Sequence, residues 1–167
     1  MSLRPTVGVL ASRVRLEEKA ILASLDAAGI DAMVLDTRRL VFSTGQPWSG
    51  PRVVLNREVG QVRALYAAHA LEARGVTVLN SGDATRVCGD KWLTTTALVA
   101  AGVPTPATSL ALTTHEGLPA IEDIGYPAVV KPLVGSWGRL VTKVSSPETA
   151  AAVMEHLDAL PHPTSPL

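Results

Sequence analysis

The segment from Gly125 to Arg139 has the order of residues that a phosphate-binding site needs. It reads Gly-Tyr-Pro-Ala-Val-Val-Lys-Pro-Leu-Val-Gly-Ser-Trp-Gly-Arg, so a short β-branched strand ends on Lys131. The loop that follows contains Gly135 and Gly138. Glycine has no Cβ and tolerates positive φ, so successive backbone amides in such a loop can approach an anion closely. A fixed cation followed by approachable amides predicts binding of nucleotide phosphates.

A second candidate lies earlier in the chain, where Cys88-Gly-Asp-Lys-Trp92 opens a predicted helix. Lys91 could present its ammonium group to a bound anion as a compact charge. The ordinary alternative is a solvated lysine at the start of a helix. Trp92 fits packing in a core or at a domain interface. We expect Cys88 to be a small buried apolar residue, because nothing nearby marks it as a nucleophile.

Other signatures of phosphate or cofactor binding are missing from the sequence. The G-x-x-G of Gly135 to Gly138 also fits a hairpin that an incidental lysine precedes. The Walker A pattern G-x-x-x-x-G-K-[ST] does not occur, and no G-x-G-x-x-G follows the first predicted strand, so nicotinamide binding is unsupported. No catalytic residue and no metal ligand is predicted, since ligand spacing is absent among the histidines, which are His69, His115, His156 and His162.

The elements that would position the first candidates alternate as in an open α/β sheet. Helically spaced apolar residues, each run ended by a glycine, predict helices over 16–28 and 60–74. Short apolar runs of the kind found in parallel sheets predict strands over 6–11, 32–35, 53–55 and 76–79. The order strand, helix, strand, strand, helix, strand requires crossover helices and therefore a parallel sheet.

The remainder of the chain has a different pattern. Residues 83–101 are helical in pattern with a break near Gly89, and Ala101-Gly-Val-Pro-Thr-Pro106 ends that stretch with a domain-boundary signal. Ser146 is a predicted helix cap, with Pro147 at the first helical position. The later predicted elements are a strand over 108–112, a helix over 115–124, strands over 127–131 and 140–144, and a helix over 147–158. The proline-rich tail, residues 159–167, is predicted to be disordered.

Composition narrows the classes of partner. Lysine and arginine together number 15, as do aspartate and glutamate, so the formal charge is zero. No broad surface for nucleic acid or for an anionic membrane is indicated, and no apolar run approaches the length of a membrane span. The single cysteine excludes an intrachain disulfide and fits a reducing compartment. We expect a cytoplasmic protein.

The two candidate motifs, CGDKW and GYPAVVKPLVGSWGR, together resemble the ATP-grasp superfamily, and within it the LysX-type ligases of carrier-protein-dependent lysine biosynthesis. The resemblance implies an α/β fold: a pre-ATP-grasp open parallel α/β domain with a linking helix over 1–103, followed by a partial α+β ATP-grasp central domain over 104–158. By motif position, Lys91 and Lys131 correspond to the two ATP-binding lysines of the family. The segment expected to cover the nucleotide consists of Gly135, Ser136, Trp137, Gly138, Arg139, Leu140 and Val141.

The resemblance also implies a reaction. In the family, ATP converts a substrate carboxylate into an acyl phosphate, and an amine then displaces phosphate. In LysX-type enzymes the carboxylate is the C-terminal glutamate of a small acidic carrier protein, and the amine belongs to α-aminoadipate. Related enzymes of arginine biosynthesis use glutamate as the amine. The alternatives are a RimK-like peptide ligase with another acceptor, and a non-catalytic remnant that binds a nucleotide or a partner.

Four arginines that follow predicted strands are weaker candidates for the substrate site. Arg13 follows the first strand, and Arg57 and Arg63 follow the third, where open α/β sheets bind ligands. Arg15 belongs to the same group. These side chains could face the acidic carrier or the substrate carboxylate. The ordinary alternative is that they are exposed arginines on loops and helices.

Family enzymes continue into a large C-terminal domain that supplies the adenine hinge, the Mg²⁺ ligands and most of the amine site. The resemblance implies ATP and Mg²⁺ as cofactors. The sequence shows no such acidic and asparagine-containing set, so we expect the metal ligands to lie outside this chain. We expect the chain to be incomplete and inactive, or very weakly active, by itself. Many related ligases associate, and a homo-oligomer is left open.

Overall fold

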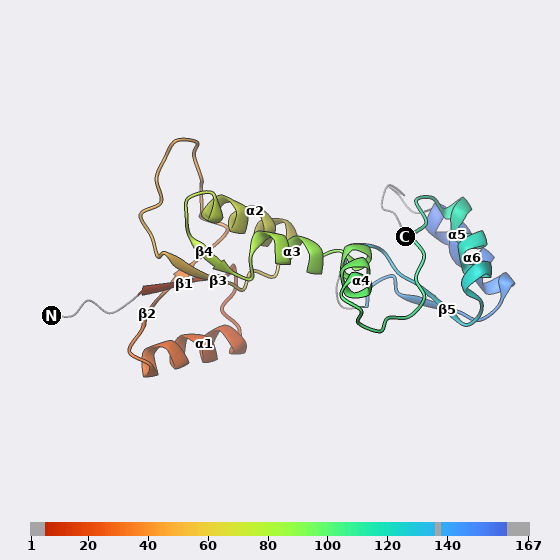
Figure 1. The fold of residues 1–167 in the computed structure, drawn as a ribbon, viewed down its shortest axis with the longest axis horizontal. Helices are drawn as coiled ribbons and strands as arrows, with labels where there is room; N and C mark the ends of the chain where they lie inside the picture. Colours follow the sequence, from red (N-terminus) through yellow and green to blue (C-terminus); the bar gives the residue numbers. More distant parts are fainter. Residues whose placement is uncertain (1–5, 136–137, 160–167) are drawn as a thin grey trace. The chain divides into compact units, whose positions relative to one another are not determined.

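The computed structural model describes residues 6–135 and 138–159 of the 167 in the chain. The chain divides into two compact units between Arg86 and Val87, and the helix α3 (Gly82–Cys88) crosses this division (Figure 1). We call these the N-terminal unit and the C-terminal unit. No helix in the described ranges is long and apolar enough to span a membrane.

The N-terminal unit is built on a four-stranded parallel sheet in the order β2-β1-β3-β4. The helix α1 (Leu16–Ala27) connects β1 to β2, and α2 (Gln61–Glu72) connects β3 to β4. The strands are β1 (Thr6–Leu10), β2 (Asp31–Leu35), β3 (Val53–Asn56) and β4 (Thr77–Leu79). The predicted open parallel α/β sheet is confirmed, with element ends that differ from those predicted by one or two residues.

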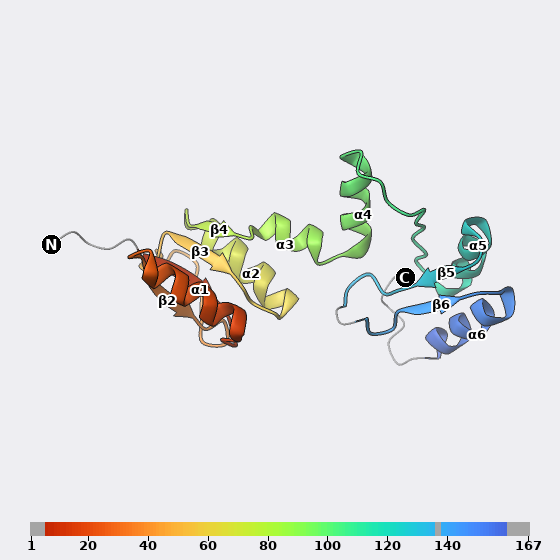
Figure 2. The same ribbon diagram turned by 90° about the horizontal axis from the view of Figure 1, so that it is seen from below.

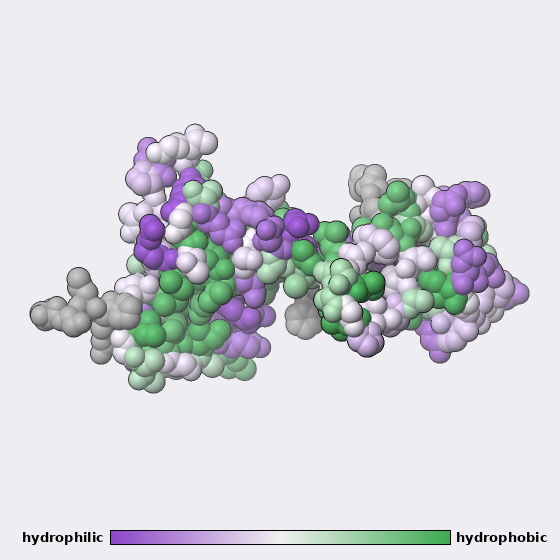
Figure 3. Space-filling model, in the orientation of Figure 1, coloured by the Kyte–Doolittle hydropathy of each residue, from purple (hydrophilic) through white to green (hydrophobic). Residues whose placement is uncertain are grey.

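The core of the N-terminal unit lies between the sheet and α2. Leu10, Val54 and Leu71 are fully buried there. Gly8 allows this packing, because a Cβ at that position would come within 2.8 Å of the Leu35 side chain and 3.0 Å of the Val54 side chain. The helix α1 lies on the opposite face of the sheet (Figure 1). The surface of this unit also carries apolar side chains (Figure 3).

The C-terminal unit contains a two-stranded antiparallel sheet of β5 (Ala128–Val130) and β6 (Thr142–Val144). The helices α5 (Thr114–Ile124) and α6 (Pro147–Asp158) pack against each other and lie beside this sheet (Figure 2). Their buried core is separate from that of the N-terminal unit and consists of Ile121, Ala128, Val130, Val144, Ala150 and Met154.

The predicted break near Gly89 is confirmed. The helix α3 ends at Cys88, and α4 (Lys91–Ala100) begins two residues after Gly89. Asp90 caps α4, since its carboxylate accepts a hydrogen bond from the Leu93 amide at 2.9 Å. The cap of α6 is also confirmed: Ser146 accepts from the Thr149 amide, and Pro147 occupies the first turn.

Two predictions about the C-terminal unit are wrong. Residues 108–112 form no strand, because they lack the backbone pairing with a neighbour that makes an extended segment a strand. Cys88 is exposed rather than buried, because it is the last residue of a short helix. The helix α4 belongs to the C-terminal unit, whereas the predicted boundary placed residues 1–103 together. The predicted tail lies outside the described residues except for Ala159.

Candidate functional site

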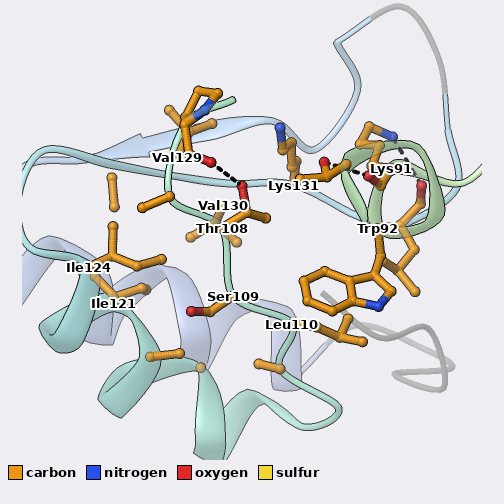
Figure 4. A pocket seen from close by; sticks show the side chains of 18 of the residues that line it. Lys91, Trp92, Thr108, Ser109, Leu110, Ile121, Ile124, Val129, Val130 and Lys131 are labelled. Carbon is orange, nitrogen blue, oxygen red and sulfur yellow. Dashed lines mark hydrogen bonds between the residues drawn. The ribbon is translucent and has the colours of Figure 1, made fainter. Parts of the chain in front are cut away.

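The C-terminal unit contains a cavity of about 580 Å³ that both candidate lysines line (Figure 4). Its walls come from α4, the extended segment 105–111, α5 and β5. Most of the lining is apolar, and hydroxyl groups come from Thr95, Thr105, Thr108 and Ser109. A cavity of this size and composition is typical of sites for small molecules.

Lys91 is the first residue of α4, and its polar contacts join it to the backbone where the glycine loop begins. Its backbone amide donates to the Leu133 carbonyl at 3.0 Å. Its Nζ donates to the Gly135 carbonyl at 3.1 Å and to the Leu133 carbonyl at 3.4 Å. A lysine in the first turn lies at the positive end of the helix dipole, which is an unfavourable position for a cation. An anion bound there would interact favourably with both the ammonium group and the helix.

Lys131 follows β5 directly and is exposed. The two lysines lie along one edge of the cavity, and the Trp92 indole extends beneath them toward Leu110 (Figure 4). The predicted boundary assigned Lys91 to the first domain and Lys131 to the second. The structure places both lysines in the C-terminal unit, on one cavity.

The predicted covering segment is described in part. Ser136 and Trp137 lie outside the described residues. Gly135 and Gly138 have positive φ angles of 148° and 67°, which L side chains rarely adopt. Arg139, Leu140 and Val141 are exposed and do not line the cavity. The glycine loop therefore adjoins the cavity through Gly135, whose carbonyl accepts from Lys91.

The sequence did not single out several of the residues that line this cavity. Trp92 was expected to pack in a core or at a domain interface, and it is half-buried with its ring on the cavity. A helical face would have been the available signal, because Lys91, Thr95 and Leu98 recur at a spacing of three to four residues and all line the cavity. No residue of the segment 105–109 was predicted to bind a ligand, because the segment contains no recognisable chemical motif.

Of the candidate arginines, Arg15 and Arg57 converge on one buried carboxylate in the N-terminal unit. Arg15 donates to Glu18 from Nε at 2.9 Å and from Nη2 at 2.8 Å. Arg57 donates to Glu18 Oε1 from Nε at 3.1 Å, and its Nη2 is also 3.1 Å away. The hydrogen bonds from Arg15 first, and then from Arg57, lower the pKa of Glu18 from 4.5 to about 2, against the opposing effect of burial.

A second buried carboxylate, Glu58, connects the loops at the same edge of the sheet. It accepts from the Thr37 hydroxyl at 2.6 Å, the Ser12 hydroxyl at 3.0 Å and the Gly60 amide at 2.7 Å. Arg63 donates to it from Nη2 at 3.2 Å. Burial raises the pKa of Glu58, but these hydrogen bonds outweigh burial, so the pKa lies below its ordinary value. Arg63 is therefore paired with Glu58.

Arg13 is exposed on the loop after β1. Within the described residues, no group of three or more His, Cys, Asp or Glu side chains could hold a metal ion. The acidic side chains on α5, Glu116, Glu122 and Asp123, are exposed, as expected for a solvated helix face. The cavity itself is lined by two lysines, whose ammonium groups can pair with an anion such as a phosphate.

Comparison with known proteins relates both units to one group of enzymes. Residues 7–87 match the family described as the LysX preATP-grasp domain. The glutamate–LysW ligase ArgX of Sulfurisphaera tokodaii is 35% identical over 147 residues, which are 88% of this chain and 52% of that protein. The α-aminoadipate–LysW ligase LysX of Sulfolobus acidocaldarius is 28% identical over 86% of this chain and 53% of that protein.

A solved structure supports the relation over nearly the whole chain. The RimK domain ATP-grasp protein of Sphaerobacter thermophilus superimposes with a TM-score of 0.81 at 27% identity, over 96% of this chain and 61% of that one. The chain spans about half the length of the curated relatives it matches.

Proposed function

Because this chain belongs to the LysX-type ligases of the ATP-grasp superfamily, we propose that it acts in the ATP-dependent joining of an amine to a carboxylate. The carboxylate would be the C-terminal glutamate of a small acidic carrier protein, and the amine would be that of glutamate or α-aminoadipate. The observation that carries the proposal is that Lys91 and Lys131 line a single cavity.

The cavity suits a nucleotide in two respects. Its apolar lining, which includes the Trp92 indole, fits a planar purine base. The ammonium groups of Lys91 and Lys131, together with the first turn of α4, would offset the charge of the phosphates. We propose that the backbone around Gly135 and Gly138 approaches the same phosphates and excludes water from them.

ATP would supply the phosphoryl group that activates the carboxylate for displacement by the amine. This chain would contribute the ammonium groups of Lys91 and Lys131 at the phosphates, which require countercharge as the reaction proceeds. We propose that a Mg²⁺ ion with ligands outside the described residues supplies further countercharge to the phosphates.

A second candidate function, a RimK-like peptide ligase with another acceptor, is favoured by the similarity to the RimK domain ATP-grasp protein. The two functions differ in the identity of the amine and of the carboxylate. Because the chain is expected to be inactive or very weakly active by itself, the two are separated by binding, measured by calorimetry with an acidic carrier ending in glutamate and with an unrelated glutamate-ended peptide. Binding of the carrier alone supports the LysX-type function, and equal binding of the unrelated peptide supports the RimK-like function.

Replacing Lys131 tests the nucleotide site separately from turnover. A charge-assisted hydrogen bond contributes about 1.5–3 kcal/mol, so Lys131→Ala should weaken ATP binding roughly 10- to 150-fold in calorimetry. Lys143→Ala is the matched control, because Lys143 is an exposed lysine on the neighbouring strand β6 that does not line the cavity. Equal ATP affinity in the two variants would contradict the assignment of Lys131.

A further inference from the structure

The carboxyl edge of the parallel sheet carries charged residues that the nucleotide cavity does not use. β1 and β3 are neighbours, but the chain leaves β1 toward β2 and leaves β3 toward β4. The loops after β1 and β3 therefore diverge. Open α/β sheets bind ligands in the crevice that forms where neighbouring strands diverge in this way. In this protein those two loops carry Arg15 and Arg57.

One buried carboxylate fixes both guanidinium groups. The Glu18 side chain is fully buried, and Arg15 and Arg57 both bond to it, at closest distances of 2.8 Å and 3.1 Å. One glutamate would be neutralised by one arginine, so the second guanidinium leaves an excess of positive charge. Arg13, Glu17 and Lys19 are exposed charged residues nearby in sequence, and with them the group holds four positive and two negative charges.

Each arginine keeps part of its side chain available for another acceptor. Both use Nε and Nη2 for Glu18, and each exposes 36% of its side chain. The Nε of Arg15 also lies 3.9 Å from Glu17 Oε2, so a ligand carboxylate would compete with Glu17 there. A guanidinium presents five N–H donors in a planar fork that matches a carboxylate. Two forks anchored from below by one buried carboxylate are held in place before a ligand arrives, which reduces the entropy lost on binding.

The surrounding loops are also held in place. Glu58 connects Ser12 after β1, Thr37 after β2 and Gly60 before α2 through hydrogen bonds of 3.0 Å or less. The Arg57 amide donates to the Leu10 carbonyl at 2.9 Å, which extends the β1–β3 pairing beyond the strands. These hydrogen bonds hold the loops after β1 and β3 to each other and to the sheet.

From this geometry we infer that Arg15 and Arg57 bind a carboxylate where the loops after β1 and β3 diverge. The inference rests on the proposed function, because a ligase of this type must hold two carboxylate-bearing substrates. The carboxylate has two possible sources, the glutamate at the end of a peptide chain or a free dicarboxylic amino acid. Arg15 and Arg57 would recognise the same group in either one.

The test is an NMR titration of the full chain with three probes. The first is an acidic pentapeptide that ends in glutamate, the second is the same peptide with a terminal glutamine amide, and the third is free glutamate. We expect the first or the third probe to shift the amides of residues 11–15 and 57–60, and the second to leave them unchanged. Tighter binding of the peptide identifies a chain end as the source, and tighter binding of glutamate identifies the amino acid.

Variants on either side of β3 distinguish loss of the Arg57 guanidinium from a general effect of removing positive charge. Arg57→Met should weaken binding of the carboxylate probe roughly 10- to 150-fold. Arg57→Lys, which keeps the charge and loses the fork, should also weaken it and guards against a folding defect in the first variant. Arg52→Met removes an exposed arginine just before the same strand β3 and should leave the affinity unchanged.

The inference is overturned if no carboxylate probe shifts these amides at millimolar concentration, or if Arg52→Met weakens binding as much as Arg57→Met does. ATP affinity in the Lys131→Ala variant is a separate measurement. Loss of the proposed nucleotide site would show there, whereas failure of the carboxylate site would show only in the Arg57 variants.

Discussion

Glu18 has an environment that is unusual for a glutamate in the first turn of a helix. Such residues are normally solvated, but the Glu18 side chain is fully buried and accepts hydrogen bonds from Arg15 and Arg57. The arginine bonds lower its pKa to about 2. The ionised form is therefore favoured in the folded protein more strongly than in the unfolded chain, where the ordinary value near 4.5 applies.

This pKa predicts how stability depends on pH. Because the folded pKa lies below the unfolded one, Glu18 stabilises the fold above about pH 4.5, and this contribution is lost as the pH falls toward 2. Glu18→Gln should therefore reduce the loss of unfolding free energy between pH 5 and pH 2.5, measured by urea denaturation. Glu17→Gln, a change in its exposed neighbour, should retain that loss. An unchanged pH dependence in Glu18→Gln would contradict the assignment.

The sequence revealed the lysines of the cavity in the C-terminal unit but not the buried carboxylates of the N-terminal unit. Lys91 and Lys131 each stand in a short motif with a local chemical meaning. The burial of Glu18 and Glu58 depends on partners up to 46 residues away, such as Ser12 for Glu58. No local pattern distinguishes such a glutamate from a solvated one.

At the scale of single elements, helix ends were predictable and pairing was not. Ser146, the predicted cap, accepts from an amide three residues away, a spacing that a sequence shows directly. Asp90 caps α4 in the same way but was not predicted. Residues 108–112 have an apolar and threonine-containing composition that suits a strand. A strand also needs a hydrogen-bonding neighbour, and the structure does not pair this segment.

The cap of α6 can be tested by itself. Ser146 accepts from the Thr149 amide at 3.3 Å, and its own amide donates to Thr149 Oγ1 at 3.0 Å. Ser146→Ala should lower the unfolding free energy by about 1 kcal/mol and speed hydrogen exchange in the first turn of α6. Ser146→Asn should preserve the cap. Ser145→Ala is the neighbouring control, and equal effects of the alanine changes at 145 and 146 would refute the role of the cap.

At the scale of the whole molecule, the described residues form two separate hydrophobic cores. The first consists of residues of the N-terminal unit, such as Leu71, and the second of residues of the C-terminal unit, such as Met154. The sequence predicted two domains because the α/β alternation stops before the glycine and prolines at 102–106. It placed α4 with the first domain, since the assignment of a connecting helix depends on its tertiary contacts.

Because the two cores are separate, a mutation in one core should lower amide protection in its own unit only. Leu71→Ala should cost about 2–5 kcal/mol, because it removes a fully buried side chain. The loss of amide protection measured by hydrogen exchange should fall on β1, β3 and α2. Leu112→Ala, a change at a side chain that is 69% exposed, should cost less than about 0.5 kcal/mol. Equal loss of protection throughout both units would argue for a single cooperative core.

The sole cysteine of the chain gives direct experimental access to the boundary between the two units. Cys88 is exposed at the end of α3, two residues after the division between Arg86 and Val87. A maleimide dye or a nitroxide should therefore attach at one position without any engineering of the sequence. Its signal would then report whether nucleotide or carboxylate probes change the surroundings of the segment that joins the units.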